Sequence, residues 1–312
     1  MNTATGLEFG IAIPQVFIGE PVDLSLVRDF VVRAESFDFG SLWVMETGSR
    51  HGPVTAQLEP LSLLAYVAGL TETARLGTSV LLSGFRNPIR LAKTLATIDH
   101  LASGRLTVGV GLGDAERAAI YGIPSGEWAA RFEEGLEVLK AVWRSGTTDF
   151  DGRFWSFENL GIEPKPLQDP HPPILFGGHA PAALRRAVRM GSGWMGAGSS
   201  SHDDFVGQRR LLAGYLEETG RSEATFSISK RVYMAVDSNP DRAEARVRAF
   251  FAAHYRSADL GSRCAVWGSP DRCAEALDAL RNEGVGMIML NPMFDHLEQL
   301  EVLVNEVLPA LR

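Results

Sequence analysis

Two acidic residues are the first candidates for proton chemistry. Glu46 follows the apolar run 41–45 directly, and Asp114 follows the glycine-rich run VGVGLG at 108–113. A carboxylate at the end of such a run can donate or accept a proton during a reaction. A solvated loop carboxylate explains either residue equally well, so proton transfer is one of two interpretations for Glu46 and Asp114.

Small residues in two places could let a cofactor approach the backbone. Gly111 and Gly113 belong to a GxGxG run, which differs from the GxGxxG fingerprint of dinucleotide-binding folds. Gly177 and Gly178 lie just before Pro181, the expected first residue of a helix whose N–H groups suit a phosphate. These glycines predict either contact with a flat, phosphorylated ligand or tight packing of strand against helix.

Hydroxyl groups follow a third apolar run. Ser199 and Ser200 come after the run 193–197 and could donate hydrogen bonds to the same ligand. A serine-rich helix cap is the alternative interpretation.

Composition and missing motifs exclude several classes. A net charge of -8 and a pI near 5.5 argue against a nucleic-acid partner. The sequence has no HExxH, CxxC, GxSxG or P-loop motif, so we expect no metal site and no hydrolase triad. Cys264 and Cys273 are expected to be free thiols. Without a signal-peptide pattern or a long apolar run, we expect a cytoplasmic protein with no membrane partner.

Short apolar runs alternate with amphipathic helical segments, a pattern typical of parallel strands covered by helices on both faces. Eight units in 312 residues favour a (β/α)8 TIM barrel over an open doubly wound sheet. The expected strands are 7–13, 41–45, 74–82, 106–110, 173–176, 193–197, 226–236 and 285–290.

Helix signals and one interruption complete the pattern. Asn87 and Pro88 predict one helix start, residues 131–143 predict another helix, and Asp295 is expected to cap the last one. After the fourth unit, residues 147–173 contain a hairpin turn at Asp151-Gly152 followed by several prolines. This insertion is a lid, a subunit contact or a plain surface loop. No flexible linker divides the chain, so residues 1–312 are expected to form one domain.

Several segments resemble the bacterial luciferase-like superfamily, and in particular its branch that uses the deazaflavin F420. They are FDFGSLWV, the stretch LEPLSLLAYVAGLTETARLGTSVLL, the stretch RNPIRLAKTLATIDHLASGRLTVGVGLG, RFEEGLEVLKAVW and PPILFGGHAPAALRRAVRMGSGW, with a weaker match at 266–290. The resemblance covers most of the chain in order.

The resemblance implies a luciferase-like barrel with the cofactor ring over the third and fourth strands. A cis peptide at Ser79-Val80 would lie under the ring, Gly111 would lie beside it, and Gly177 and Gly178 would approach the phosphate. Many deazaflavin relatives carry Asp-His after the second strand, where this sequence has Glu46-Thr47. A lysine that some relatives use for the cofactor tail is replaced near Ser201-His202.

These features predict an oxidoreductase that transfers a hydride between F420 and a small organic substrate, with Asp114 or Glu46 handling the proton. One alternative is an FMN-dependent monooxygenase that receives reduced cofactor from a separate reductase, its pocket lined by Phe17, Phe85 and Trp194. A non-catalytic flavin-binding protein is another. A homodimer is the expected assembly.

Overall fold

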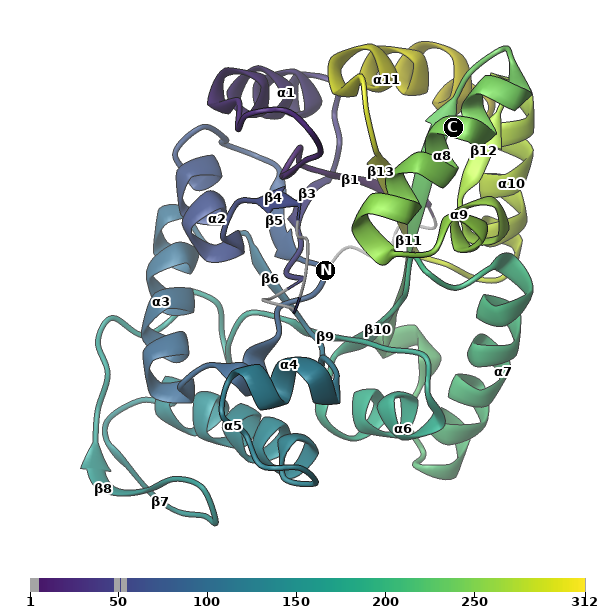
Figure 1. Cartoon of the computed structure of the whole chain (residues 1–312). Helices are drawn as coiled ribbons and strands as arrows, with labels where there is room; N and C mark the ends of the chain where they lie inside the picture. Colours follow the sequence, from purple (N-terminus) through teal and green to yellow (C-terminus); the bar gives the residue numbers. More distant parts are fainter. Residues whose placement is uncertain (1–5, 48–50, 52–54, 312) are drawn as a thin grey trace.

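Eight parallel strands close into a barrel in the computed structural model, which describes residues 6–47, 51 and 55–311 (Figure 1). Each strand pairs with the next, and β13 pairs back with β1 to close the ring. All eight expected strands are present. They are β1 Glu8–Ala12, β3 Ser41–Val44, β5 Arg75–Thr78, β6 Leu106–Val110, β9 Ile174–Gly177, β10 Gly193–Gly196, β11 Ser227–Val236 and β13 Met287–Pro292.

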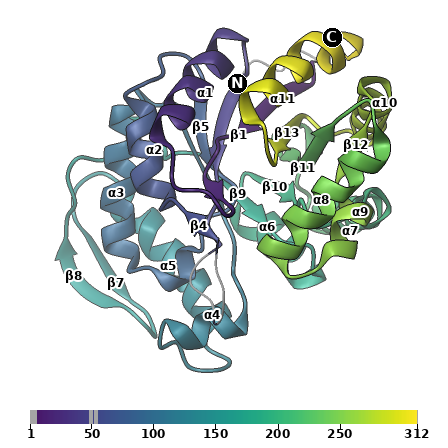
Figure 2. The same ribbon diagram turned by 45° about the horizontal axis from the view of Figure 1, so that its top comes forward.

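Helices surround the strands, as Figures 1 and 2 show from two directions. They are α1 Leu24–Ser36, α2 Pro60–Ala68, α3 Pro88–Leu101, α4 Ala115–Ile120, α5 Trp128–Trp143, α6 Pro181–Met190, α7 His202–Glu218, α8 Pro240–Tyr255, α9 Ala258–Cys264, α10 Pro270–Asn282 and α11 His296–Val302. No helix in the described ranges combines the length and the apolarity that a bilayer crossing would need.

Local signals explain where several helices begin. The Asn87 side chain accepts hydrogen bonds from the N–H groups of Ile89 and Arg90, and Pro88 occupies the first helical position of α3, as predicted. The prediction for the last helix was half right. Helix α11 follows Asp295, but that side chain makes no capping hydrogen bond because it forms an ion pair with Arg246 of α8.

The barrel interior is closed below its mouth by a layer of large side chains. Trp43 of β3 crosses the interior, and Met195, Met287 and Met289 pack in the same cluster. A Cβ atom at Gly77 would lie 2.3 Å from the Trp43 ring, so only glycine leaves room for the indole on the neighbouring strand. This layer is packed, so in the described part of the barrel we look for a ligand site at the carboxyl ends of the strands.

The insertion after the fourth unit is an antiparallel hairpin of β7 Thr148–Asp151 and β8 Ser156–Leu160. Figure 1 shows it at the outer edge of the molecule, beside α5. Its strand residues are absent from the described lining of the cavities at the barrel mouth, which disfavours a lid. Three further short strands, β2 Val16–Phe17, β4 Ala56–Gln57 and β12 Val266–Gly268, lie outside the ring of eight.

Candidate active site

Two adjoining cavities open at the carboxyl ends of the strands. The first has a volume of about 210 Å³ and is lined by residues that follow β3, β5, β9 and β10. The second, about 430 Å³, lies over the ends of β6 and β9 and the start of α6. They share five lining residues, namely Val80, Leu82, Arg117, Gly177 and Gly178, and together form one continuous site.

Val80 forms a raised floor between the two cavities. The peptide bond between Ser79 and Val80 is cis, as the resemblance implied. A Cβ atom at Gly111 would lie 2.4 Å from one Val80 methyl, and one at Gly177 would lie 2.7 Å from the other. These two glycines, which also line the cavities, are therefore needed to make room for the Val80 side chain. The group that approaches these glycines closely is therefore the Val80 side chain.

Glu46 holds this floor in place. Its backbone N–H donates to the Val80 carbonyl at 3.2 Å, and its carboxylate accepts from the Leu82 N–H at 2.7 Å. The second carboxylate oxygen lies 2.6 Å from Arg86, which also pairs with Glu59. Both oxygens of Glu46 are thus engaged, although the residue lines the first cavity.

The far end of the second cavity suits an anion. Helix α6 starts at Pro181, which has no N–H, and the Ala180 side chain makes no cap. The Ala183 N–H donates to the Ala180 carbonyl at 2.8 Å, so the Ala182 N–H is the one in the first turn that is left for a ligand. Gly178 has φ of +114°, a conformation that a residue with a Cβ rarely adopts. Two cations line the same cavity: Arg117, which forms an ion pair with Asp114, and Arg186, which forms one with Glu133.

The two predicted serines differ in position. Ser199 lines the first cavity. Ser200 is 4 % exposed and its hydroxyl accepts a hydrogen bond from Gln208, so it supports the loop rather than the cavity. The helix-cap interpretation holds for the next residue, Ser201, which forms a capping box with Asp204 at the start of α7.

Asp114 lines the second cavity next to Gly113 and is half exposed. Its carboxylate caps α4 by accepting from the Arg117 N–H at 2.9 Å, and it also forms an ion pair with the Arg117 side chain. Trp194, expected near the ligand, instead stacks on Phe205 outside the barrel, and its Nε1–H donates to the Gly178 carbonyl.

Sequence reasoning missed two polar groups in the first cavity. Arg231 of β11 points into the barrel and donates to the Ser79 carbonyl at 2.9 Å. Tyr255, the last residue of α8, lines the cavity with its hydroxyl 2.7 Å from that of Tyr233. Burial raises the pKa of Tyr233 well above its ordinary value. For Arg231, the sequence did offer a signal: two adjacent basic residues, Lys230 and Arg231, lie inside an otherwise apolar strand.

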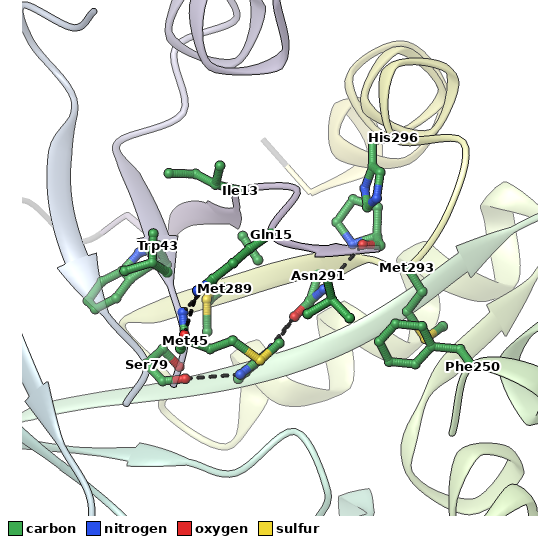
Figure 3. A pocket seen from close by; sticks show the side chains of 15 residues that line it. Ile13, Gln15, Trp43, Met45, Ser79, Phe250, Met289, Asn291, Met293 and His296 are labelled. Carbon is green, nitrogen blue, oxygen red and sulfur yellow. Dashed lines mark hydrogen bonds between the residues drawn. The ribbon is translucent and has the colours of Figure 1, made fainter. Parts of the chain in front are cut away.

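A third pocket, of about 20 Å³, continues from Ser79 and Arg231 toward α11 (Figure 3). Figure 3 shows Met45 and Ser79 on one side, His296 and Phe250 on the other, and Asn291 between them. Among the side chains that the structure describes, no cluster of His, Cys, Asp or Glu has the composition of a metal site. Cys264 and Cys273 are both free, as predicted.

The geometry defines a (β/α)8 barrel with one continuous site at the carboxyl ends of its strands. The model of the luciferase-like monooxygenase family matches residues 7–286, so the chain belongs to that family.

Individual relatives and one solved structure are also similar to this chain. An uncharacterized protein of Mycobacterium tuberculosis (strain ATCC 25618 / H37Rv) is 31 % identical over 221 residues, which cover 70 % of this chain and 72 % of the relative. An F420-dependent glucose-6-phosphate dehydrogenase of Beutenbergia cavernae is 31 % identical over 228 residues, or 69 % of this chain and 65 % of that protein. A solved F420-dependent secondary alcohol dehydrogenase, in complex with an F420-acetone adduct, superposes with a TM-score of 0.84 at 18 % identity. It covers 98 % of this chain and 99 % of its own, and at that identity it supports the fold alone.

Proposed function

We propose that this protein is an F420-dependent oxidoreductase that transfers a hydride between the deazaflavin and a small organic substrate. One observation carries the proposal: in a chain of this family, the Val80 floor adjoins an uncapped helix N-terminus that suits a phosphate. Relatives named as F420-dependent dehydrogenases support deazaflavin over flavin.

The residues present fit such a cofactor. The ring would rest over Ser79-Val80 and beside Gly111, and its phosphate would meet α6 near Gly177 and Gly178. Ser199 and Gly113 line the remaining walls. When bound, the deazaflavin supplies the two-electron hydride chemistry, and the protein supplies binding, orientation and exclusion of water.

Tyr255 is our candidate for the proton-handling group, in addition to Asp114 and Glu46. Tyr255 lines the first cavity, and its hydroxyl is held by a hydrogen bond to that of buried Tyr233. Both oxygens of Glu46 are already engaged and Asp114 caps α4, so we assign those two carboxylates mainly positioning roles. Tyr255→Phe is expected to lower kcat more than Asp114→Asn or Glu46→Gln, with cofactor affinity unchanged.

Cofactor titration tests the proposal. Purified protein is expected to bind F420 at micromolar concentration, measured by its fluorescence, and not to bind FMN. Micromolar FMN binding without F420 binding would overturn the proposal and favour the monooxygenase supplied by a reductase. F420 binding without turnover on any alcohol, ketone or carboxylic acid tested would favour a non-catalytic carrier.

A helix-cap variant tests the phosphate site directly. Ala180→Asp would place a carboxylate at the N-cap position of α6, next to its first N–H groups, which should stabilise the helix by about 1 kcal/mol. The same carboxylate would compete with and repel the phosphate, so F420 affinity should fall while Tm rises. Ala180→Ser is the matched control that caps without charge. Unchanged affinity in Ala180→Asp would place the phosphate elsewhere.

A further inference from the structure

Arg231 is a buried cation at the point where the first cavity meets the third pocket. The residue is 7 % exposed and lines both. Its Nε donates to Asn291 Oδ1 at 3.0 Å and its Nη1 to the Ser79 carbonyl at 2.9 Å. Its Nη2 donates to the same Asn291 oxygen and faces the sulfur of Met45 at 3.3 Å. All of these acceptors are neutral.

Within the described residues, no carboxylate neutralises this charge. None of the ion pairs among them includes Arg231. The sequence has no Asp or Glu in the segments that the structure does not describe, which are 1–5, 48–50, 52–54 and 312. Glu46 is the only acidic residue among those described as lining the cavity and the pocket, and it pairs with Arg86. A buried charge without an opposite partner is costly, so a site of this kind favours an anion supplied from outside.

The guanidinium also has donor capacity to spare. Arginine carries five N–H donors, and a thioether such as that of Met45 is a weak acceptor. Two parallel N–H groups of a guanidinium match the two oxygens of a carboxylate. Beyond Arg231 the third pocket has apolar walls, including Ile13, Phe250 and Met293, and it continues into a groove of about 520 Å³ between α8 and α11.

We infer that the substrate of the proposed oxidoreductase carries a carboxylate joined to an apolar body, and that Arg231 pairs with this carboxylate beside Ser79. Calling this ligand the substrate rests on the proposed function. The anion site itself depends only on Arg231 and on the cavity and the pocket that it lines. Asn291 acts as the positioning residue that fixes the guanidinium.

Binding of benzoate, compared with that of its neutral isostere benzamide, tests the inference without a cofactor. Calorimetry on the full chain should show benzoate bound at least about tenfold more tightly than benzamide. Arg231→Met should reduce this preference to near one, and Arg231→Lys should keep part of it. Arg105→Met is the matched control. Arg105 also donates to neutral oxygens, on Thr71 and Ala74, but it precedes β6 at the opposite end of the barrel, so its loss should leave the preference intact.

Three results would overturn the inference, and they differ in what they exclude. Equal binding of benzoate and benzamide by the unmodified protein, or a preference that survives in Arg231→Met, removes the anion site. A loss of F420 affinity in Arg231→Met with benzoate binding intact would assign the charge to the cofactor. If Arg231→Met does not fold, Arg231→Gln takes its place, and a benzoate-specific rise in Tm of the unmodified protein remains the required result. Failure of F420 binding alone would remove the proposed function and leave the anion site standing.

Discussion

Replacing Gly111 by alanine tests whether the glycines exist to seat Val80. The added Cβ would lie 2.4 Å from a Val80 methyl, shorter by more than about 1 Å than an ordinary carbon–carbon contact. Overpacking of this kind costs about 1–3 kcal/mol. Val80→Ala removes the methyl that clashes, so the double variant should recover most of that cost. We expect a coupling energy of about 1 kcal/mol or more between the two sites.

Urea unfolding of the two single variants and the double variant measures the coupling. A parallel F420 titration should show weaker binding in Gly111→Ala because Val80 is displaced from the floor. Gly214 of α7 provides the control, since a Cβ there meets no atom within 4 Å. Gly214→Ala should raise stability by up to about 1 kcal/mol. Additive effects of Gly111→Ala and Val80→Ala, with no loss of stability in the first, would refute the reasoning.

Four further predictions concern the titration of two buried groups, the thiols and the assembly. Burial lowers the pKa of Lys230 to about 7, so the unfolded chain binds the extra proton between about pH 7 and 10.5. Stability should therefore rise with pH across that window, and Lys230→Met should flatten the rise in urea midpoints. Burial lowers the pKa of His296 to about 4, so stability should fall as pH drops from about 6.5 to 4, and His296→Phe should weaken that fall. Burial raises the pKa of Cys273 to about 12, so iodoacetamide should label Cys273 only when the protein unfolds. A disulfide between Cys273 and Cys264, detected by mass spectrometry, would contradict the assignment of both as free thiols. Light scattering should give the mass of a dimer, and a monomer would contradict that expectation.

The barrel could be predicted because its signals are local. Each buried strand is a short apolar run, and helix starts such as Asn87-Pro88 carry their own capping chemistry. The hairpin itself was predicted for the same reason, but its turn was misplaced. Asp151 still pairs with Ser156 at the end of β7, and the turn is formed by residues 152–155 instead of Asp151-Gly152. Asp295 shows the limit of such signals. Its partner Arg246 lies 49 positions away, and competition between a cap and an ion pair is decided by the tertiary structure.

The site was predicted in outline and missed in its most informative parts. The strand ends place Gly111, Gly177 and Ser199 around one opening, as expected from their positions after apolar runs. Sequence order alone could not show that Val80 fills the space that the glycines leave. Tyr255 ends a helix with no motif around it, and only the fold brings it to the cavity.

A crystal structure of the protein with bound F420 would test the central claim most directly. We predict electron density for the ring on the face of Val80 and for the phosphate at the first turn of α6. Density in the groove between α8 and α11 instead, with the Val80 floor left bare, would contradict the account.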